Sequence, residues 1–130
     1  MHAAAIRLLR TVRQEDAASG IAGAQLSALS VLVFAGPQTL GALARAEQVK
    51  PPTMSQTVAQ LEARGLVARR PLDRRSIQVA VTDKGRKLME AGRKRRLTLL
   101  AKAFADLPPS KLDILEEAAR IMIAASARRP

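Results

Sequence analysis

The 130-residue chain contains no cysteine, no tryptophan and no tyrosine, and its only histidine is His2. The absence of cysteine excludes a disulfide framework, a thiolate metal site and a thiol redox switch. One histidine cannot form a metal site alone, and no clustered acids accompany it, so no metal is predicted. No apolar run approaches the roughly 18 residues that span a membrane. Arg7 and Arg10 interrupt the apolar segment of any signal peptide, so the sequence predicts a cytoplasmic protein.

Residues suited to catalysis are also lacking. The chain has no glycine-rich phosphate loop, and it has neither a cysteine nucleophile nor a second histidine. Two pairs of adjacent acids occur, at residues 15–16 and 116–117. Neighbours in sequence point in different directions on a helix, so these pairs do not form carboxylate dyads. We therefore expect neither an enzyme nor a bound cofactor.

Hydrophobic residues make up 48% of the chain, whereas aromatic residues make up only 2%. The core must therefore consist of Ala, Leu, Ile and Val, which favours helices. Residues 1–130 are expected to form a single domain, because this length suits one hydrophobic core and not two.

Positive charge is concentrated in one part of the chain. The formal net charge is +11, and residues 64–96 carry +9 of it. A localised basic face predicts a polyanionic partner.

A short helix followed by a basic hairpin is predicted within residues 49–82. Pro51 and Pro52 suit the first turn of a helix, where a missing N–H has no cost. Three apolar residues then recur at helical spacing and predict one buried stripe. They are Met54, Val58 and Leu61. Gly65 ends this helix, because glycine readily takes the left-handed conformation.

The opposite face of the same helix is polar and uncharged. Its residues are Thr53, Gln56, Thr57 and Gln60. Glutamine can pair bidentately with adenine, and the threonine methyl group can contact thymine. Direct or water-mediated base contacts in the major groove of double-stranded DNA are therefore predicted, with an ordinary solvated face as the alternative.

After Gly65, residues 66–67 begin one strand, and residues 77–81 form a second strand with alternating apolar side chains. The loop between the strands carries four arginines and one acid over residues 69–75. Arginines in such a turn contact phosphates or enter a narrow minor groove. The helix and the hairpin together are what reading DNA requires.

Residues 73–85, DRRSIQVAVTDKG, resemble the wing signature of the MarR family of bacterial transcriptional regulators. That signature consists of D-x-R, then alternating apolar residues, then L-T-x-x-G. Residues 60–67, QLEARGLV, resemble the end of that family's recognition helix and its first wing strand. A looser similarity extends from about residue 25 to the C-terminus. The resemblance implies a mainly α-helical fold with a small β-hairpin: a winged helix-turn-helix with N- and C-terminal dimerisation helices.

The remaining helices are predicted from their apolar periodicity and end signals. They are expected at residues 3–18, 25–34, 39–48, 83–105 and 110–126. Thr39 and Thr82 stand at N-cap positions of two of them. Residues 40–61 then form a helix-turn-helix, whose second helix enters the major groove.

The DNA-binding core is expected at about residues 24–82, with dimerisation helices at about residues 3–20 and 83–126. In the resembled family the first helix and the last two helices interlock with those of a second subunit. The residues expected at this interface are Ile6, Leu9, Leu112, Leu115, Ile121 and Met122. Two recognition helices about 34 Å apart would read a palindrome. The alternative is that these helices fold back as intramolecular core.

Four residues near helix starts are candidates for phosphate contact. Thr39 would cap its helix and present that N-terminus to a phosphate. The resembled family usually has Ser or Thr near the start of the recognition helix, where this chain has Lys50 followed by two prolines. Lys50 or Thr53 would replace that hydroxyl. Ser55 would bind a phosphate or fit a tight helix crossing.

Four residues of the hairpin are assigned roles. Arg75 occupies the arginine of the D-x-R motif and is expected to enter the minor groove. Asp73 would orient the wing by hydrogen bonding or by pairing with that arginine. Arg74 and Arg69 are expected to contact phosphates, with a solvated turn charge as the alternative for each arginine.

The favoured interpretation is a homodimeric, sequence-specific transcriptional regulator, most simply a repressor that blocks a promoter. The resemblance further implies a small, often aromatic ligand that binds between the dimer and DNA-binding regions and releases the DNA. The alternative is a basic architectural protein that coats or bends DNA without sequence preference. The uncharged recognition face and the localised charge favour the regulator.

Overall fold

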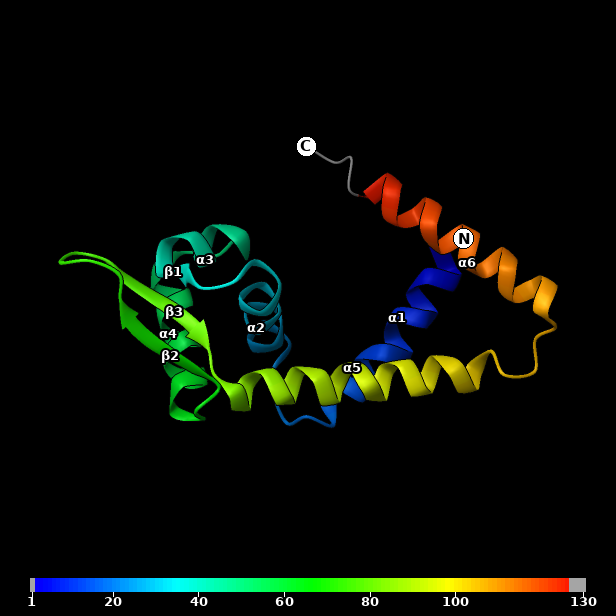
Figure 1. Cartoon of the computed structure of the whole chain (residues 1–130), viewed down its shortest axis with the longest axis horizontal. Coiled ribbons are helices and arrows are strands. Elements are labelled where there is room, and N and C mark those ends of the chain that lie inside the picture. The colour runs from blue at the N-terminus through cyan, green and yellow to red at the C-terminus, as the bar shows by residue number, and fades with distance from the viewer. Residues whose placement is uncertain (1, 127–130) are drawn as a thin grey trace. The chain divides into compact units, whose positions relative to one another are not determined.

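The computed structural model describes residues 2–126, and within them the chain forms six helices and three strands (Figure 1). Their bounds are α1 His2–Ala17, α2 Gly23–Ala35, β1 Gln38–Thr39, α3 Leu40–Ala46, α4 Pro51–Ala63, β2 Val67–Pro71, β3 Ile77–Val81, α5 Asp83–Ala103 and α6 Pro109–Ser126. Every helix begins and ends within two residues of its predicted position. The predicted fold class is confirmed.

The chain divides into two compact units, with the boundary between Arg96 and Leu97 inside α5. The first unit contains α1 to α4, the three strands and most of α5. The second contains the end of α5 and the whole of α6. None of the helices within residues 2–126 is both long and apolar enough to cross a lipid bilayer.

The helix-turn-helix consists of α3 and α4, which pack against each other. Thr39 is the N-cap of α3, as predicted, and its Oγ1 accepts a hydrogen bond of 3.2 Å from the Ala42 N–H. In the turn between the two helices Gln48 has a φ of 55°, which lies in the left-handed region. Pro51 occupies the first position of α4, where it needs no hydrogen-bond acceptor.

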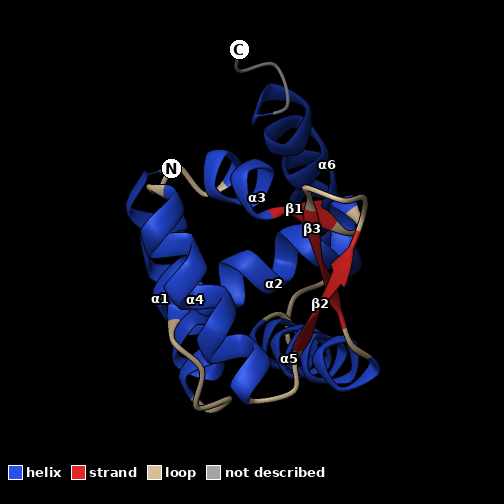
Figure 2. Ribbon diagram, turned by 90° about the vertical axis from the view of Figure 1, so that its left-hand side faces the viewer, coloured by secondary structure: helices blue, strands red, loops and turns tan. Residues whose placement is uncertain are grey.

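The sheet is antiparallel with strand order β1-β3-β2 (Figure 2). The pairing of β2 with β3 is the predicted hairpin and runs from Val67 opposite Val81 to Pro71 opposite Ile77. Strand β1 was not predicted. It pairs with β3 through Gln38 and Thr39 only, and two residues are too few to show an alternating pattern.

The hydrophobic core lies in the first unit, where α2 contacts α3, α4 and β3. Its largest fully buried side chains are Leu29, Leu32, Leu43, Val58, Leu61, Leu66 and Val79. These residues come from α2, α3, α4, the turn after α4 and the sheet, so the core fixes α4 relative to the hairpin. Helices α1 and α6 bury none of their side chains in the single chain.

The start of α5 is tied to the end of α4 through Thr82. The Thr82 hydroxyl accepts a hydrogen bond of 3.1 Å from the Gly85 N–H and donates one of 2.6 Å to the Gly65 carbonyl. The Thr82 N–H donates to the Leu66 carbonyl at 3.0 Å. A Cβ on Gly85 would overlap that same carbonyl oxygen and lie 2.8 Å from Val81 Cγ2. The close packing at the start of α5 therefore leaves no room for a side chain at position 85.

Candidate nucleic-acid interface

The outer face of α4 presents uncharged polar side chains to solvent. Met54, Val58 and Leu61 are buried, as predicted. Because successive helical residues are rotated by about 100°, Gln56 lies almost opposite this stripe, and it is exposed. Within residues 2–126 the Gln56 amide has no hydrogen-bond partner. Its donor and acceptor groups are therefore available for a base edge.

The remaining predicted residues of this face differ in their exposure and in their hydrogen bonds. Thr53 is exposed, whereas Ser55 and Thr57 are half-buried at the two flanks of the buried stripe. The Thr57 hydroxyl donates a hydrogen bond of 3.1 Å to the Thr53 carbonyl. The methyl group of Thr57 takes no part in this bond, and a threonine methyl group can contact thymine. Gln60 is exposed, and its Oε1 accepts a hydrogen bond of 2.7 Å from Gln25 Nε2 of α2.

At the helix starts, the Thr39 side chain is engaged in a capping hydrogen bond, whereas the Lys50 side chain is not. The Thr39 hydroxyl is half-buried and already engaged as the cap of α3. Lys50 is the exposed N-cap residue of α4, and its side chain makes no capping hydrogen bond. The Lys50 ammonium is thus available next to the helix N-terminus, where anions bind favourably.

Asp73 organises the turn of the wing, which comprises residues 72–76. Its Oδ1 accepts hydrogen bonds from the Arg75 N–H at 2.7 Å and the Ser76 N–H at 2.8 Å. Its Oδ2 accepts a third from the Ser76 hydroxyl at 2.9 Å. Asp73 therefore orients the wing by hydrogen bonding and not by pairing with the Arg75 side chain. The sequence analysis assigned no role to Ser76, although Asp side chains in turns commonly accept hydrogen bonds from backbone N–H groups that follow them.

The arginines of the hairpin are exposed and lie along its length. Arg74 and Arg75 are at the turn that Asp73 holds, and neither side chain has a partner within the described residues. Arg69 forms an ion pair of 3.2 Å with Glu62 near the end of α4. This pair connects the base of the wing to α4. Leu72 and Ile77 flank the turn with side chains 55% and 53% exposed, so the wing also presents apolar surface.

The hydrogen bonds to Asp73 lower the pKa of its carboxyl group below the ordinary value of 3.8, with the Arg75 N–H as the largest cause. Because the folded-state pKa is lowered, the carboxylate stabilises the turn fully above pH 3.8. That stabilisation is lost as the pH falls through the lower, folded value. The wing is therefore expected to keep its shape throughout the neutral range.

Asp73→Ala is expected to loosen the wing turn with only a small decrease in the unfolding midpoint of the protein, because the turn lies outside the core. The measurement is amide hydrogen exchange, in which the Arg75 and Ser76 N–H groups should exchange faster. Asp73→Asn is the matched control, since its amide oxygen can still accept both N–H bonds. Unchanged exchange in the Asp73→Ala protein would contradict this role for Asp73.

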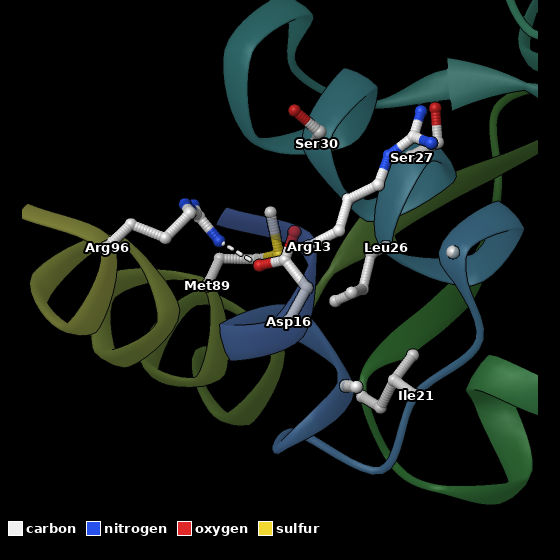
Figure 3. Close-up of a pocket in the computed structure, with 10 residues that line it drawn as sticks. Arg13, Asp16, Ile21, Leu26, Ser27, Ser30, Met89 and Arg96 are labelled. Atoms are coloured by element: carbon white, nitrogen blue, oxygen red, sulfur yellow. Dashed lines mark hydrogen bonds and ion pairs between the residues drawn. The ribbon is translucent and has the colours of Figure 1, made fainter. Parts of the chain in front are cut away.

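A cavity of about 670 Å³ lies in the first unit among α1, α2 and α5 (Figure 3). Its lining residues are Arg13, Asp16, Ala17, Ile21, Gly23, Leu26, Ser27, Ser30, Met89 and Arg96. Arg96 forms an ion pair with Asp16 across this cavity, and Arg13 extends toward Ser27. The cavity combines apolar side chains, hydroxyls and charges. Within residues 2–126 no cluster of His, Asp and Glu is suited to holding a metal ion.

The family model for the MarR family matches residues 19–76, from the turn after α1 to the wing. An HTH-type transcriptional regulator of Mycobacterium bovis is 41% identical over 123 residues, which cover 93% of this chain and 86% of that protein. The chain belongs to the MarR family. As a member of the MarR family it is a DNA-binding transcriptional regulator and not an enzyme.

Solved structures of other proteins share this fold. A transcriptional regulator from Thermotoga maritima is 28% identical with a TM-score of 0.81, and the match covers 98% of this chain and 94% of that chain. A MarR family protein from Bacillus stearothermophilus has a TM-score of 0.84 at 23% identity, covering 98% of this chain and 90% of that chain. The second likeness shows the fold alone. The predicted family is confirmed.

Proposed function

We propose that this protein is a cytoplasmic, homodimeric repressor that reads a palindromic operator in double-stranded DNA. Each subunit places α4 in the major groove and its wing in the adjacent minor groove. The observation that carries this proposal is the combination of an exposed, uncharged polar face on α4 with an arginine wing fixed to the same helix. Gln56 supplies the freest base-reading group, and Arg69 links the wing to α4 through Glu62.

Base contacts and phosphate contacts divide between the two elements. On α4 we assign base readout to Gln56 and Gln60, with methyl contacts from Thr53 and Thr57. Phosphate contacts are assigned to Thr39, Lys50, Ser55, Arg69 and Arg74. Arg75 is assigned to the minor groove, where narrow A·T-rich segments attract arginine. Asp73 does not touch DNA but keeps Arg74 and Arg75 in place.

The proposed dimer is supported by apolar side chains that the single chain leaves exposed. On α1, Ile6 and Leu9 are 37% and 44% exposed. On α6 the corresponding residues are Leu112, Leu115, Ile121 and Met122, between 39% and 60% exposed. Neither helix has a fully buried side chain within its own chain, which favours the dimer over the intramolecular alternative. A second copy of the chain would remove this surface from water.

The proposed effector site is the cavity lined by α1, α2 and α5 (Figure 3). Its volume suits a small organic ligand, because ligand pockets typically measure about 300–1,000 Å³. Asp16 of α1 and Arg96 of α5 meet across it. A ligand that separated this ion pair would move α1 relative to α5. Because both helices belong to the proposed dimerisation region, such a movement would change the spacing of the two α4 helices and release the DNA.

Gln56→Ala tests sequence-specific reading. It is expected to weaken binding to the preferred operator by about 1–3 kcal/mol and to relax the preference at one position of each half-site. Arg74→Ala is the contrasting variant, because loss of a phosphate contact weakens binding equally on all sequences and lowers the salt slope by about 1. Dissociation constants on the operator and on base-substituted duplexes measure both effects. Equal losses for Gln56→Ala on every duplex would contradict base readout.

A further inference from the structure

A hydrogen bond joins the recognition helix to α2, which lies outside the helix-turn-helix. Gln25 Nε2 of α2 donates to Gln60 Oε1 of α4 at 2.7 Å, across 35 positions of sequence. Gln25 is half-buried, whereas Gln60 is exposed on the outer side of α4. Within the described residues this is the one hydrogen bond between side chains that reaches a predicted base-reading residue of α4.

The bond defines which way the Gln60 amide faces. An amide oxygen has two acceptor positions and an amide nitrogen has two donor hydrogens. With Gln25 on one acceptor position, Gln60 keeps a second acceptor position and both donors. Adenine offers an acceptor at N7 and a donor at N6 on its major-groove edge, which this pair of groups matches. A glutamine without such a partner samples many rotamers and loses that freedom on binding.

We propose that Gln25 is a positioning residue for base readout, which holds the Gln60 amide in the orientation that selects adenine in each half-site. Gln25 acts through Gln60 and does not itself touch the DNA. This inference rests on the proposed function, in which α4 enters the major groove. It adds a specificity determinant outside the helix-turn-helix and the wing.

Gln25 has little part in holding α2 and α4 together. Leu29 and Leu32 of α2 and Val58 and Leu61 of α4 belong to one buried cluster. The Gln25–Gln60 bond lies at the surface, where water replaces a lost hydrogen bond at small cost. A variant that removes it is therefore expected to fold normally.

The test is a double-mutant cycle on DNA binding with Gln25→Met, Gln60→Ala and the double variant. Methionine has nearly the length of glutamine and no N–H donor. Gln25→Met is expected to weaken binding to the preferred duplex about three- to tenfold, because the released Gln60 side chain must then lose rotamer freedom on binding. It should also weaken the adenine preference at one position of each half-site. In the Gln60→Ala background Gln25→Met should change neither quantity.

Three outcomes would overturn the inference. One is an equal loss from Gln25→Met with and without Gln60. The second is unchanged affinity and base preference in Gln25→Met. The third is a preference at the Gln60 position for a base other than adenine in the wild-type protein. Melting temperatures of the variants are measured alongside, and a specific loss requires them to match the wild-type value.

The same experiment separates this inference from the proposed function through Gln56→Ala. If Gln56→Ala changes base preference while Gln25→Met does not, α4 reads DNA without help from Gln25, and only the inference fails. If the wild-type protein shows no base preference at any position, the proposed function fails and the inference fails with it.

Discussion

Gly85→Ala is expected to lower the free energy of unfolding by about 2–3 kcal/mol, near the upper end of the usual cost of overpacking. The added methyl group would overlap the Leu66 carbonyl oxygen and press on Val81 Cγ2. The Leu66 carbonyl cannot move away freely, because it accepts a hydrogen bond from the Thr82 N–H. Backbone is less able than a flexible side chain to relax around an inserted atom.

The measurement for Gly85→Ala is urea unfolding followed by circular dichroism. Gly23→Ala is the matched control, because nothing lies within 4 Å of a Cβ at that helical position. It is expected to leave stability unchanged or to raise it by up to about 1 kcal/mol. A Gly85→Ala protein as stable as the wild type would contradict the close backbone contact at the start of α5.

Ile121→Glu is expected to convert the protein to a monomer and to weaken binding to a palindromic operator by about 10²–10⁴-fold. Ile121 is 60% exposed on α6, and in the proposed dimer a carboxylate there would be buried without a partner. The loss of affinity follows because a monomer engages one half-site without the effective concentration that a second site provides. Binding to a duplex with a single half-site should remain at the wild-type level.

Analytical ultracentrifugation gives the oligomeric state of Ile121→Glu, and titration of both duplexes gives the affinities. Ser110→Glu introduces the same charge on the same helix at an exposed polar position, and it should remain a dimer with wild-type affinity. A folded Ile121→Glu dimer would place the interface elsewhere on the chain.

The helix boundaries could be predicted because their causes are local. Pro51 begins α4, Thr39 and Thr82 cap α3 and α5, and Gly65 follows α4 with a φ of 70°. Each of these residues acts through its own backbone preference or on atoms a few positions away. The wing hairpin was predictable for the same reason, since alternation and turn residues lie within one short segment.

Contacts between distant segments could not be predicted in this way. Strand β1 exists because two residues pair with β3, far along the chain. The sequence shows Gln60 as a polar residue on α4, but nothing near it indicates that Gln25 holds its amide. The same holds for Arg96 of α5, which pairs with Asp16 of α1, 80 positions earlier in the sequence. Such pairings depend on which helix faces which, a property of the packed core.

The most direct test of sequence-specific, dimeric reading is selection of bound duplexes from a random DNA pool at near-physiological salt. An enriched inverted repeat with half-sites about one helical turn apart is the predicted result. This result would show both sequence specificity and binding by a symmetric dimer. It would also supply the operator duplex for measuring the affinities of the variants described above. Binding without enrichment of any sequence would contradict the account and would favour a basic protein that coats DNA.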